Sequence, residues 1–170
     1  MTDPDDSLQA DATAMRLVRR RWASGVAVIT TNDDEGMSGA TVSAFLVLSL
    51  EPPLILVCLY DGARITDAVR RSRRFGVSML DVAQEPLADR FSGRGPGLDG
   101  YFTGVPYELS ARGTPALGGA LGFIDCAVRD VHEGGDHVLI VATVIDVLLA
   151  PDTDDPLLAY EGQFRRLASS

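Results

Sequence analysis

The 170-residue chain has few of the side chains that bind metals or form disulfides, with two histidines and two cysteines. Cys58 and Cys126 lie far apart in the sequence, each within an apolar, strand-like run, and they form no CxxC pair. Free cysteines in such runs usually behave as small buried hydrophobic residues. A structural zinc site needs four ligands, most of them Cys or His. The sequence therefore predicts two buried free thiols and no metal site.

The chain also lacks a long apolar run and an excess of basic residues. No window holds the roughly 18 uninterrupted apolar residues that a membrane span needs. The first residues, MTDPDDSLQADA, are acidic and polar, unlike the basic start and apolar middle of a signal peptide. The 15 Lys and Arg residues against 24 Asp and Glu give a net charge of −9, which argues against a nucleic-acid-binding face. We therefore expect a cytoplasmic protein that binds neither membranes nor nucleic acid.

The composition that remains is typical of a single globular domain. An apolar fraction of 46% over this length suits one folded domain, residues 12–168, preceded by an acidic flexible tail, residues 1–11. Local clusters of arginine interrupt the acidic background at residues 16–21 and 70–74. Such clusters can bind phosphate-bearing small molecules, although most are solvated helix faces. The sequence alone leaves both interpretations open.

Strand patterns dominate the chain. Six strands are expected, with the second either continuous or interrupted by a loop, at residues 26–31, 37–50, 54–60, 75–81, 123–131 and 137–150. Helices are expected at residues 12–24, ended by Gly25, and as short segments within 61–75 and 81–91. This pattern predicts a mainly β fold, an antiparallel barrel of Greek-key type with flanking short helices. Because 54–60 and 138–149 are apolar at consecutive positions, one face needs a cover, and we expect a homodimer.

Two local features limit the chemistry. The glycine-rich loop 92–100 has neither the GxGxxG pattern after a strand nor a P-loop pattern, which excludes a Rossmann or Walker site there. His137, in GGDHVLIV, opens a strand after two glycines, and no nucleophile pattern supports a catalytic triad around it. His132 is expected to be an exposed hairpin residue.

Seven sequence blocks occur in a familiar order between about residues 14 and 167. They are RRRWASGVAVITT, GATVSAFLVLSLEPPLILVCL, RFGVSML, LADRFSG, GTPALGGALGFIDCAV, GGDHVLIVATV and PLLAYEGQFRRL. In this order they resemble the flavin reductase-like proteins of the FMN-binding split-barrel fold. These are the NAD(P)H:flavin oxidoreductase components that supply diffusible reduced flavin to a separate partner monooxygenase. The resemblance implies FMN or FAD as the flavin and NADH or NADPH as the hydride donor.

The resemblance also implies site residues. Thr41, Ser43 and the small residues around them offer hydroxyls and close backbone approach to a flavin ring, although such a stretch can equally be a plain strand bend. By resemblance, the flavin is lined by Thr41, Val42, Ser43, Ala44, Phe45, Val47 and Leu48. The phosphate loop is Gly62, Ala63 and Arg64.

Some positions of that loop depart from the family pattern. Many relatives carry hydroxyls where this chain has Ala63 and Ile65, so either Thr66 or a backbone amide at the helix start is expected to replace them. Phe91 and Ser92 are expected beside the flavin, with core packing as the alternative for Phe91. His137 and Tyr160 are expected at the nicotinamide end of the site.

The expected reaction needs little acid–base machinery, because the flavin and nicotinamide carry the hydride chemistry and the protein positions them. Two alternatives keep the fold. In one, the chain is a flavin-binding module without turnover. In the other, a permanently bound flavin acts directly on an organic substrate.

Overall fold

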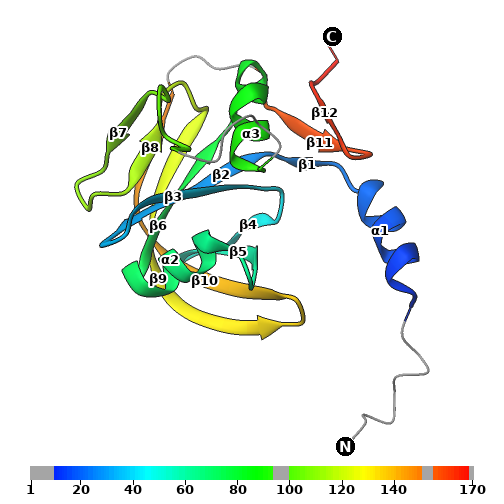
Figure 1. Ribbon diagram of the computed structural model, residues 1–170, viewed down its shortest axis with the longest axis horizontal. Coiled ribbons are helices and arrows are strands. Elements are labelled where there is room, and N and C mark those ends of the chain that lie inside the picture. The colour runs from blue at the N-terminus through cyan, green and yellow to red at the C-terminus, as the bar shows by residue number, and fades with distance from the viewer. Residues whose placement is uncertain (1–9, 94–99, 151–154, 169–170) are drawn as a thin grey trace, which may run out of the picture.

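The computed structural model describes residues 10–93, 100–150 and 155–168 (Figure 1). The expected acidic tail, apart from Ala10 and Asp11, lies outside the described residues, as does most of the glycine-rich loop. No helix among the described residues is long and apolar enough to cross a membrane.

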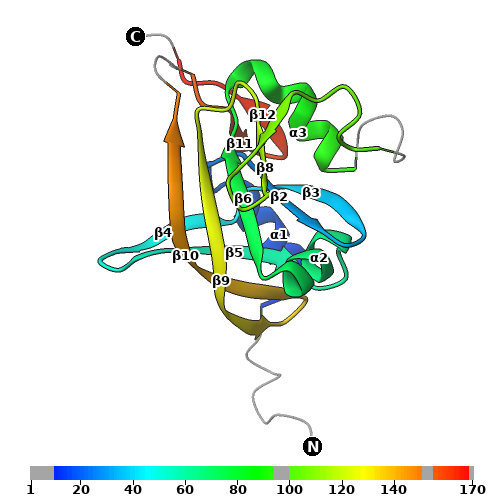
Figure 2. The same cartoon turned by 90° about the vertical axis from the view of Figure 1, so that its left-hand side faces the viewer.

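Seven antiparallel strands form the main sheet, in the order β3-β2-β6-β9-β10-β5-β4. Their bounds are β2 Ala27–Asp33, β3 Gly36–Val42, β4 Phe45–Leu50, β5 Pro53–Tyr60, β6 Arg74–Met79, β9 Gly122–Gly134 and β10 His137–Leu149. The two edge strands, β3 and β4, are consecutive in the chain and separated by Ser43 and Ala44 alone. The sheet therefore curls until its edges meet at this corner, as the two views show (Figures 1 and 2). The prediction of a mainly β, barrel-like fold with short flanking helices is confirmed.

Smaller elements cover the sheet. A three-stranded sheet joins β1 Ser24–Gly25, β11 Leu158–Tyr160 and β12 Gln163–Arg165, and a hairpin pairs β7 Tyr107–Leu109 with β8 Pro115–Leu117. The helices are α1 Ala12–Arg20, α2 Arg64–Ser72, the 3-10 helix η2 Val82–Gln84 and α3 Glu85–Phe91. Helix α2 packs against β2 and β3, and α3 packs against β3. Both helices thus border the edge strand β3.

The buried side chains form two clusters. The first fills the curled sheet under α2 and includes Ile29, Ile55, Phe75 and Ile140, none more than 1% exposed. The second lies under α3 and the small sheet, and its members include Val28, Leu80, Ala88, Phe91 and Leu157. Burial alternates along β5 and the first half of β10, as expected for strands with one face inward. Strand β3 packs against both clusters, through Ala40 and Val42 against the first and through Met37 against the second.

One expected element differs from the structure, one is settled between two alternatives, and one was not predicted. Helix α1 ends at Arg20, not Gly25, because Ser24 and Gly25 instead pair with β11. The segment 37–50 is interrupted at the Ser43–Ala44 corner, which was one of the two alternatives. The hairpin of β7 and β8 was not predicted, since strands of three residues are too short to show a period.

The cysteines and His132 lie about where the sequence indicated. Both cysteines are free. Cys126 is fully buried, whereas Cys58 is half-buried, and burial raises the pKa of both thiols. His132 is exposed, near the end of β9. The prediction of a buried free thiol is therefore confirmed for Cys126, whereas Cys58 departs from it because it is only half-buried.

Candidate functional site

Three cavities follow one another along strand β3. We name them the outer cavity, beside Met37, the central cavity, beside Ser38, Gly39 and Ala40, and the inner cavity, beside Thr41, Val42 and Ser43. Their volumes are about 360, 250 and 270 Å³, respectively. The outer and central cavities share Arg64 and Tyr101, and the central and inner cavities share Ser92. Together they form a discontinuous cleft along the edge strand.

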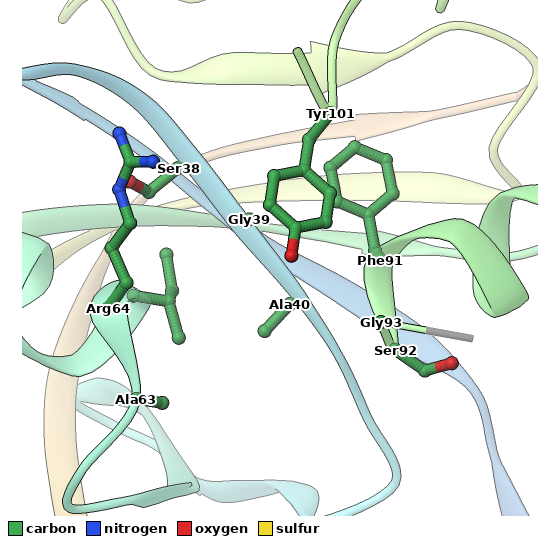
Figure 3. Close-up of a pocket in the computed structure, with 10 residues that line it drawn as sticks. Ser38, Gly39, Ala40, Ala63, Arg64, Phe91, Ser92, Gly93 and Tyr101 are labelled. Carbon is green, nitrogen blue, oxygen red and sulfur yellow. The ribbon is translucent and has the colours of Figure 1, made fainter. Parts of the chain in front are cut away.

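Aromatic rings form one wall of the central cavity (Figure 3). The Phe91 and Tyr101 rings stack with centroids 6.0 Å apart and planes inclined by 16°. Figure 3 shows the Tyr101 hydroxyl directed toward β3 and Arg64 on the opposite side of the cavity. A Cβ at Gly39 would come within 2.7 Å of the Phe91 ring. Glycine at this position therefore lets an aromatic wall lie directly on the β3 backbone.

The N-terminus of α2 forms the facing wall. Its N-cap, Ala63, provides no side-chain cap, and the Ala63 carbonyl accepts from the Thr66 amide at 2.9 Å. The Thr66 hydroxyl already donates its proton to the Tyr60 carbonyl at 2.7 Å, and this residue is buried, so it has no donor left for a phosphate. Of the two expected replacements for the missing loop hydroxyls, the uncapped amides at the helix start are therefore the group that remains. Helix N-termini of this kind favour anions.

Arg64 is the one cation that lines the central cavity among the described residues. On the same helix, Arg70 pairs with Asp61 at 2.7 Å and Arg71 with Asp33 at 2.8 Å. Within the part of the chain that the structure describes, no carboxylate lies within 4.0 Å of the Arg64 guanidinium. A guanidinium can bind two phosphate oxygens at once. The central cavity thus combines a cation, uncapped amides and aromatic surface.

The inner cavity contains the corner residues that the sequence indicated. Thr41, Val42 and Ser43 line it together with Ser92. Thr41 donates its hydroxyl to the Ala88 carbonyl at 2.6 Å, so Ser43, which is exposed, carries the free hydroxyl of this pair. A neighbouring apolar cavity of about 300 Å³ lies on the other side of the corner and is lined by Val42, Ser43 and Phe45 among others. Polar and apolar surfaces therefore meet at the end of β3.

Some sequence-predicted flavin residues lie outside these cavities. The Ala44 carbonyl accepts from the Cys58 amide at 3.0 Å, a contact that closes the barrel corner. Val47 and Leu48 are 57% and 49% exposed on β4. Gly62 is exposed and lies against the Tyr60 ring. One chain therefore brings Thr41 to Ser43, Phe45, Ala63, Arg64, Phe91 and Ser92 to cavity walls, and leaves the other four on the surface beside them.

The two expected nicotinamide residues lie apart from the cavities. His137 opens β10 and meets the Tyr60 ring edge-on at 5.9 Å. Its Nδ1 lies 2.7 Å from Asp136 Oδ1, and this hydrogen bond holds the pKa of the Asp136 carboxyl below its usual value. Tyr160 is half-buried in β11. Neither side chain lines the central or the inner cavity.

The structure adds residues that sequence reasoning missed. Ser38 and Tyr101 line the central cavity, and Arg19, Gln163 and Phe164 line the inner one. Arg19 belongs to an arginine cluster, which was a signal for phosphate binding too general to single it out. Tyr101 follows the glycine-rich loop, where no period places a side chain. Gln163 and Phe164 come from a strand of three residues, too short to be recognised, whereas Ser38 lies in a predicted strand whose pattern did not single it out.

No group of three or more potential metal ligands occurs among the described residues. A cation, uncapped amides, hydroxyls and flat apolar walls instead suit an aromatic ligand that carries phosphate. Fold and cleft thus define a nucleotide-binding β-barrel protein. The residues present fit a flavin nucleotide, whose phosphate matches Arg64 and whose ring system matches the mixed surface at the end of β3.

Comparison with known proteins identifies the family. The chain belongs to the flavin reductase like domain family, which matches residues 19–168. It is 36% identical over 159 residues to the flavin-dependent monooxygenase, reductase subunit HsaB, of Mycobacterium tuberculosis, covering 93% of this chain and 83% of the relative. It is 33% identical over 171 residues to an NADH-dependent FAD reductase of Streptomyces globisporus, covering 99% and 90%.

Solved structures give the same result. The flavin reductase PheA2 in its native state superposes with a TM-score of 0.85 at 31% identity, covering 94% of this chain and all of that one. The Streptomyces globisporus NADH:FAD oxidoreductase SgcE6, in complex with NAD and FAD fragments, gives a TM-score of 0.83 at 31% identity, covering 99% and 96%.

Proposed function

We propose that this protein is an NAD(P)H:flavin oxidoreductase that reduces FMN or FAD and supplies the reduced flavin to a separate monooxygenase. The observation that carries the proposal is the central cavity of a chain of the flavin reductase family. There Arg64, which has no carboxylate partner among the described residues, and the uncapped start of α2 face an aromatic wall. Relatives named as NADH-dependent reductases and as reductase subunits of monooxygenases support both halves of the proposal.

The chain's own residues bind and orient the substrates. Arg64 and the first amides of α2 hold the flavin phosphate. Phe91 limits where the bound flavin can lie over β3. Ser43 and the backbone of the β3–β4 corner supply polar groups to the edge of the ring system. When bound, the two nucleotides supply the hydride donor and acceptor, so the protein needs no general base. Orientation is the protein's contribution to the rate.

His137 and Tyr160 are proposed for the nicotinamide end. The edge contact between His137 and Tyr60, and the hydrogen bond to Asp136, hold the imidazole at the β5–β10 end of the sheet. The imidazole therefore lies near the phosphate loop, because the Asp61 amide just before that loop donates to the Asp136 carbonyl at 3.1 Å. We infer contact with the nicotinamide and assign no proton transfer to this side chain.

We further propose a cytoplasmic homodimer. Apolar side chains are exposed on three parts of the structure. They are Met15, Leu17, Val18 and Trp22 in and after α1, Leu46, Val47, Leu48 and Leu50 in β4, and Ile145, Val147, Leu148 and Leu149 in β10. Helix α1 has no buried residue although its side chains are amphipathic. So much exposed apolar surface is typical of a subunit interface.

One assay tests the function. Purified protein is mixed with NADH or NADPH and with FMN, FAD or riboflavin, and the loss of nicotinamide absorbance is followed. We expect rapid oxidation with at least one pair. If no combination is oxidised, the proposal fails, and tight co-purification of a yellow cofactor would then favour a flavin-binding module.

Gel filtration during turnover separates the proposal from its second alternative. A reductase that supplies diffusible flavin loses the flavin on the column and needs it added back. If the flavin stays bound and turnover continues with an organic substrate, the flavin is a prosthetic group and the supply function is wrong.

A further inference from the structure

The outer cavity is not needed by a flavin mononucleotide. Along β3, Thr41 to Ser43 border the inner cavity, Ser38 to Ala40 the central one, and Met37 the outer one. At about 3.3 Å per residue, the strand from Met37 to Ser43 spans about 20 Å. A mononucleotide with its ring at the β3–β4 corner and its phosphate at Arg64 ends at the central cavity. The outer cavity begins where that ligand stops.

Arg64 connects the two cavities, since it lines both of them. Its partner in this role is Tyr101, which also lines both. A guanidinium between two adjoining cavities can bind oxygens of two linked phosphates, because its donors diverge in one plane. FAD differs from FMN in that its phosphate continues into a second phosphate and an adenosine. The position of Arg64 therefore matches the pyrophosphate of a dinucleotide.

The walls of the outer cavity suit a flat base. Tyr101, Phe102 and Tyr107 contribute aromatic surface, and Met37 contributes a thioether. Phe102 meets both Phe91 and Tyr107 edge-on, at 5.2 and 5.5 Å between centroids, so these rings form one packed group. Nucleobases of every kind stack on aromatic surfaces, because each base has a flat π-face. Among the residues that the structure describes, no Asp or Glu lines this cavity, although the chain as a whole is acidic.

We propose that the outer cavity binds the adenylate half of FAD and makes FAD, not FMN, the preferred flavin of this protein. The inference rests on the proposed function and deepens it, since it selects one of the two flavins. The adenine lies among Met37, Tyr101 and Tyr107, and the second phosphate lies between Arg64 and Thr103.

The test measures flavin binding without any turnover. Dissociation constants of oxidised FAD and FMN are determined by fluorescence titration for the wild-type protein, for Thr103→Glu and for Leu109→Glu. Thr103 is exposed and lines the outer cavity, so the new carboxylate faces the second phosphate there. Leu109 is 55% exposed on β7, does not line that cavity, and controls for the added charge.

We expect the wild-type protein to bind FAD about tenfold more tightly than FMN, and Thr103→Glu to weaken FAD about tenfold while FMN changes less than about twofold. Leu109→Glu leaves both constants unchanged. Unchanged FMN binding also shows that the variant is folded. A second variant, Met37→Ala, removes apolar wall instead of adding charge and is expected to weaken FAD selectively.

Two results overturn the inference. Equal wild-type constants for FAD and FMN, or equal weakening of both flavins by Thr103→Glu and Met37→Ala, would show that the adenylate half is not held in the outer cavity. In either case NADH oxidation with added flavin would leave the proposed function intact. If the wild-type protein binds neither flavin, the inference and the proposed function both fail.

Discussion

The two ends of the cleft along β3 differ in how much of their wall one chain provides. At the phosphate end, α2, β3 and the stacked Phe91 and Tyr101 enclose the central cavity. At the ring end, β3 turns at Ser43 into β4, whose side chains are largely exposed. The difference matches the proposed homodimer, in which a single chain holds the phosphate and a second copy completes the surroundings of the ring and the nicotinamide.

The largest effect is expected from a change that removes the proposed interface. Leu46, 47% exposed on β4, is changed to Asp, which places a charge on the apolar face. We expect a monomer in sedimentation at micromolar concentration and a loss of NADH oxidation rate of about 100-fold. A charge buried in an interface makes the free energy of association less favourable by about as much as the loss of a hot-spot residue does. The affinity for FMN, which the phosphate contacts at the central cavity provide, should fall far less.

Leu109→Asp is the matched control, since this leucine is 55% exposed on β7, which is none of the three elements that carry the exposed apolar groups. It should leave both the sedimentation and the rate unchanged. A Leu46→Asp protein that stays dimeric, or a monomer with full turnover, would contradict a shared ring end.

The next effect concerns the phosphate end itself. Arg64→Ala removes a charge-assisted contact worth about 1.5–3 kcal/mol, so the dissociation constant of FMN should rise about 10- to 100-fold. Riboflavin, which has no phosphate, should bind as before. The control is Arg70→Ala, which removes a cation already paired with Asp61 on the same helix. Equal losses for riboflavin and FMN would place the phosphate elsewhere.

A smaller effect is expected for the nicotinamide contact. His137→Ala should raise the KM for NADH about three- to tenfold and leave the KM for flavin unchanged, because the imidazole is assigned a contact and no chemistry. Asp136→Asn, which keeps the ring and alters its partner, is the comparison variant. Steady-state kinetics with each substrate varied separately give the answer. If neither NADH affinity nor turnover changes, the nicotinamide assignment is wrong.

The smallest effect concerns the ion pair that ties α2 to the end of β2. Burial of Asp33 alone would raise the pKa of its carboxyl, but the hydrogen bond from Arg71, the Glu35 amide and the nearby arginine charges outweigh it and hold that pKa below the usual 3.8. A lowered folded-state pKa stabilises the protein above the unfolded pKa, and this contribution is lost as the pH falls through the folded value.

Asp33→Asn should therefore lower the free energy of unfolding by about 1 kcal/mol or less at pH 7, and the difference from wild type should shrink as the pH falls below 3.8. Urea denaturation at several pH values measures it. A difference that grows toward acid pH would have the wrong sign for this pair.

The sequence was informative where long periodic elements or ordered blocks exist. The runs that became β5, β9 and β10 were predicted within a few residues, and the barrel class followed from them. In the site, Thr41 to Ser43 and Arg64 were expected from the family resemblance, and the structure brings them to neighbouring cavities along β3.

What could not be predicted depends on long-range contacts. Tyr101 lines the cleft because its ring stacks on Phe91, a contact between a loop and a helix that no local pattern encodes. The commitment of Thr66 to the Tyr60 carbonyl likewise appears only once α2 packs against the end of β5. Similarly, Gly25 is a residue type that often follows a helix end, but its pairing with β11 makes it a strand residue.

The most direct test of the account is NADH oxidation by the purified wild-type protein at saturating FAD, followed by anaerobic observation of flavin bleaching. We expect that NADH is consumed and that free FAD in excess over protein becomes fully reduced, because reduced flavin leaves the cleft and is replaced. Bleaching limited to one flavin per chain would contradict the supply of diffusible flavin. No bleaching with either nicotinamide nucleotide would contradict the assignment of the cleft as a flavin reductase site.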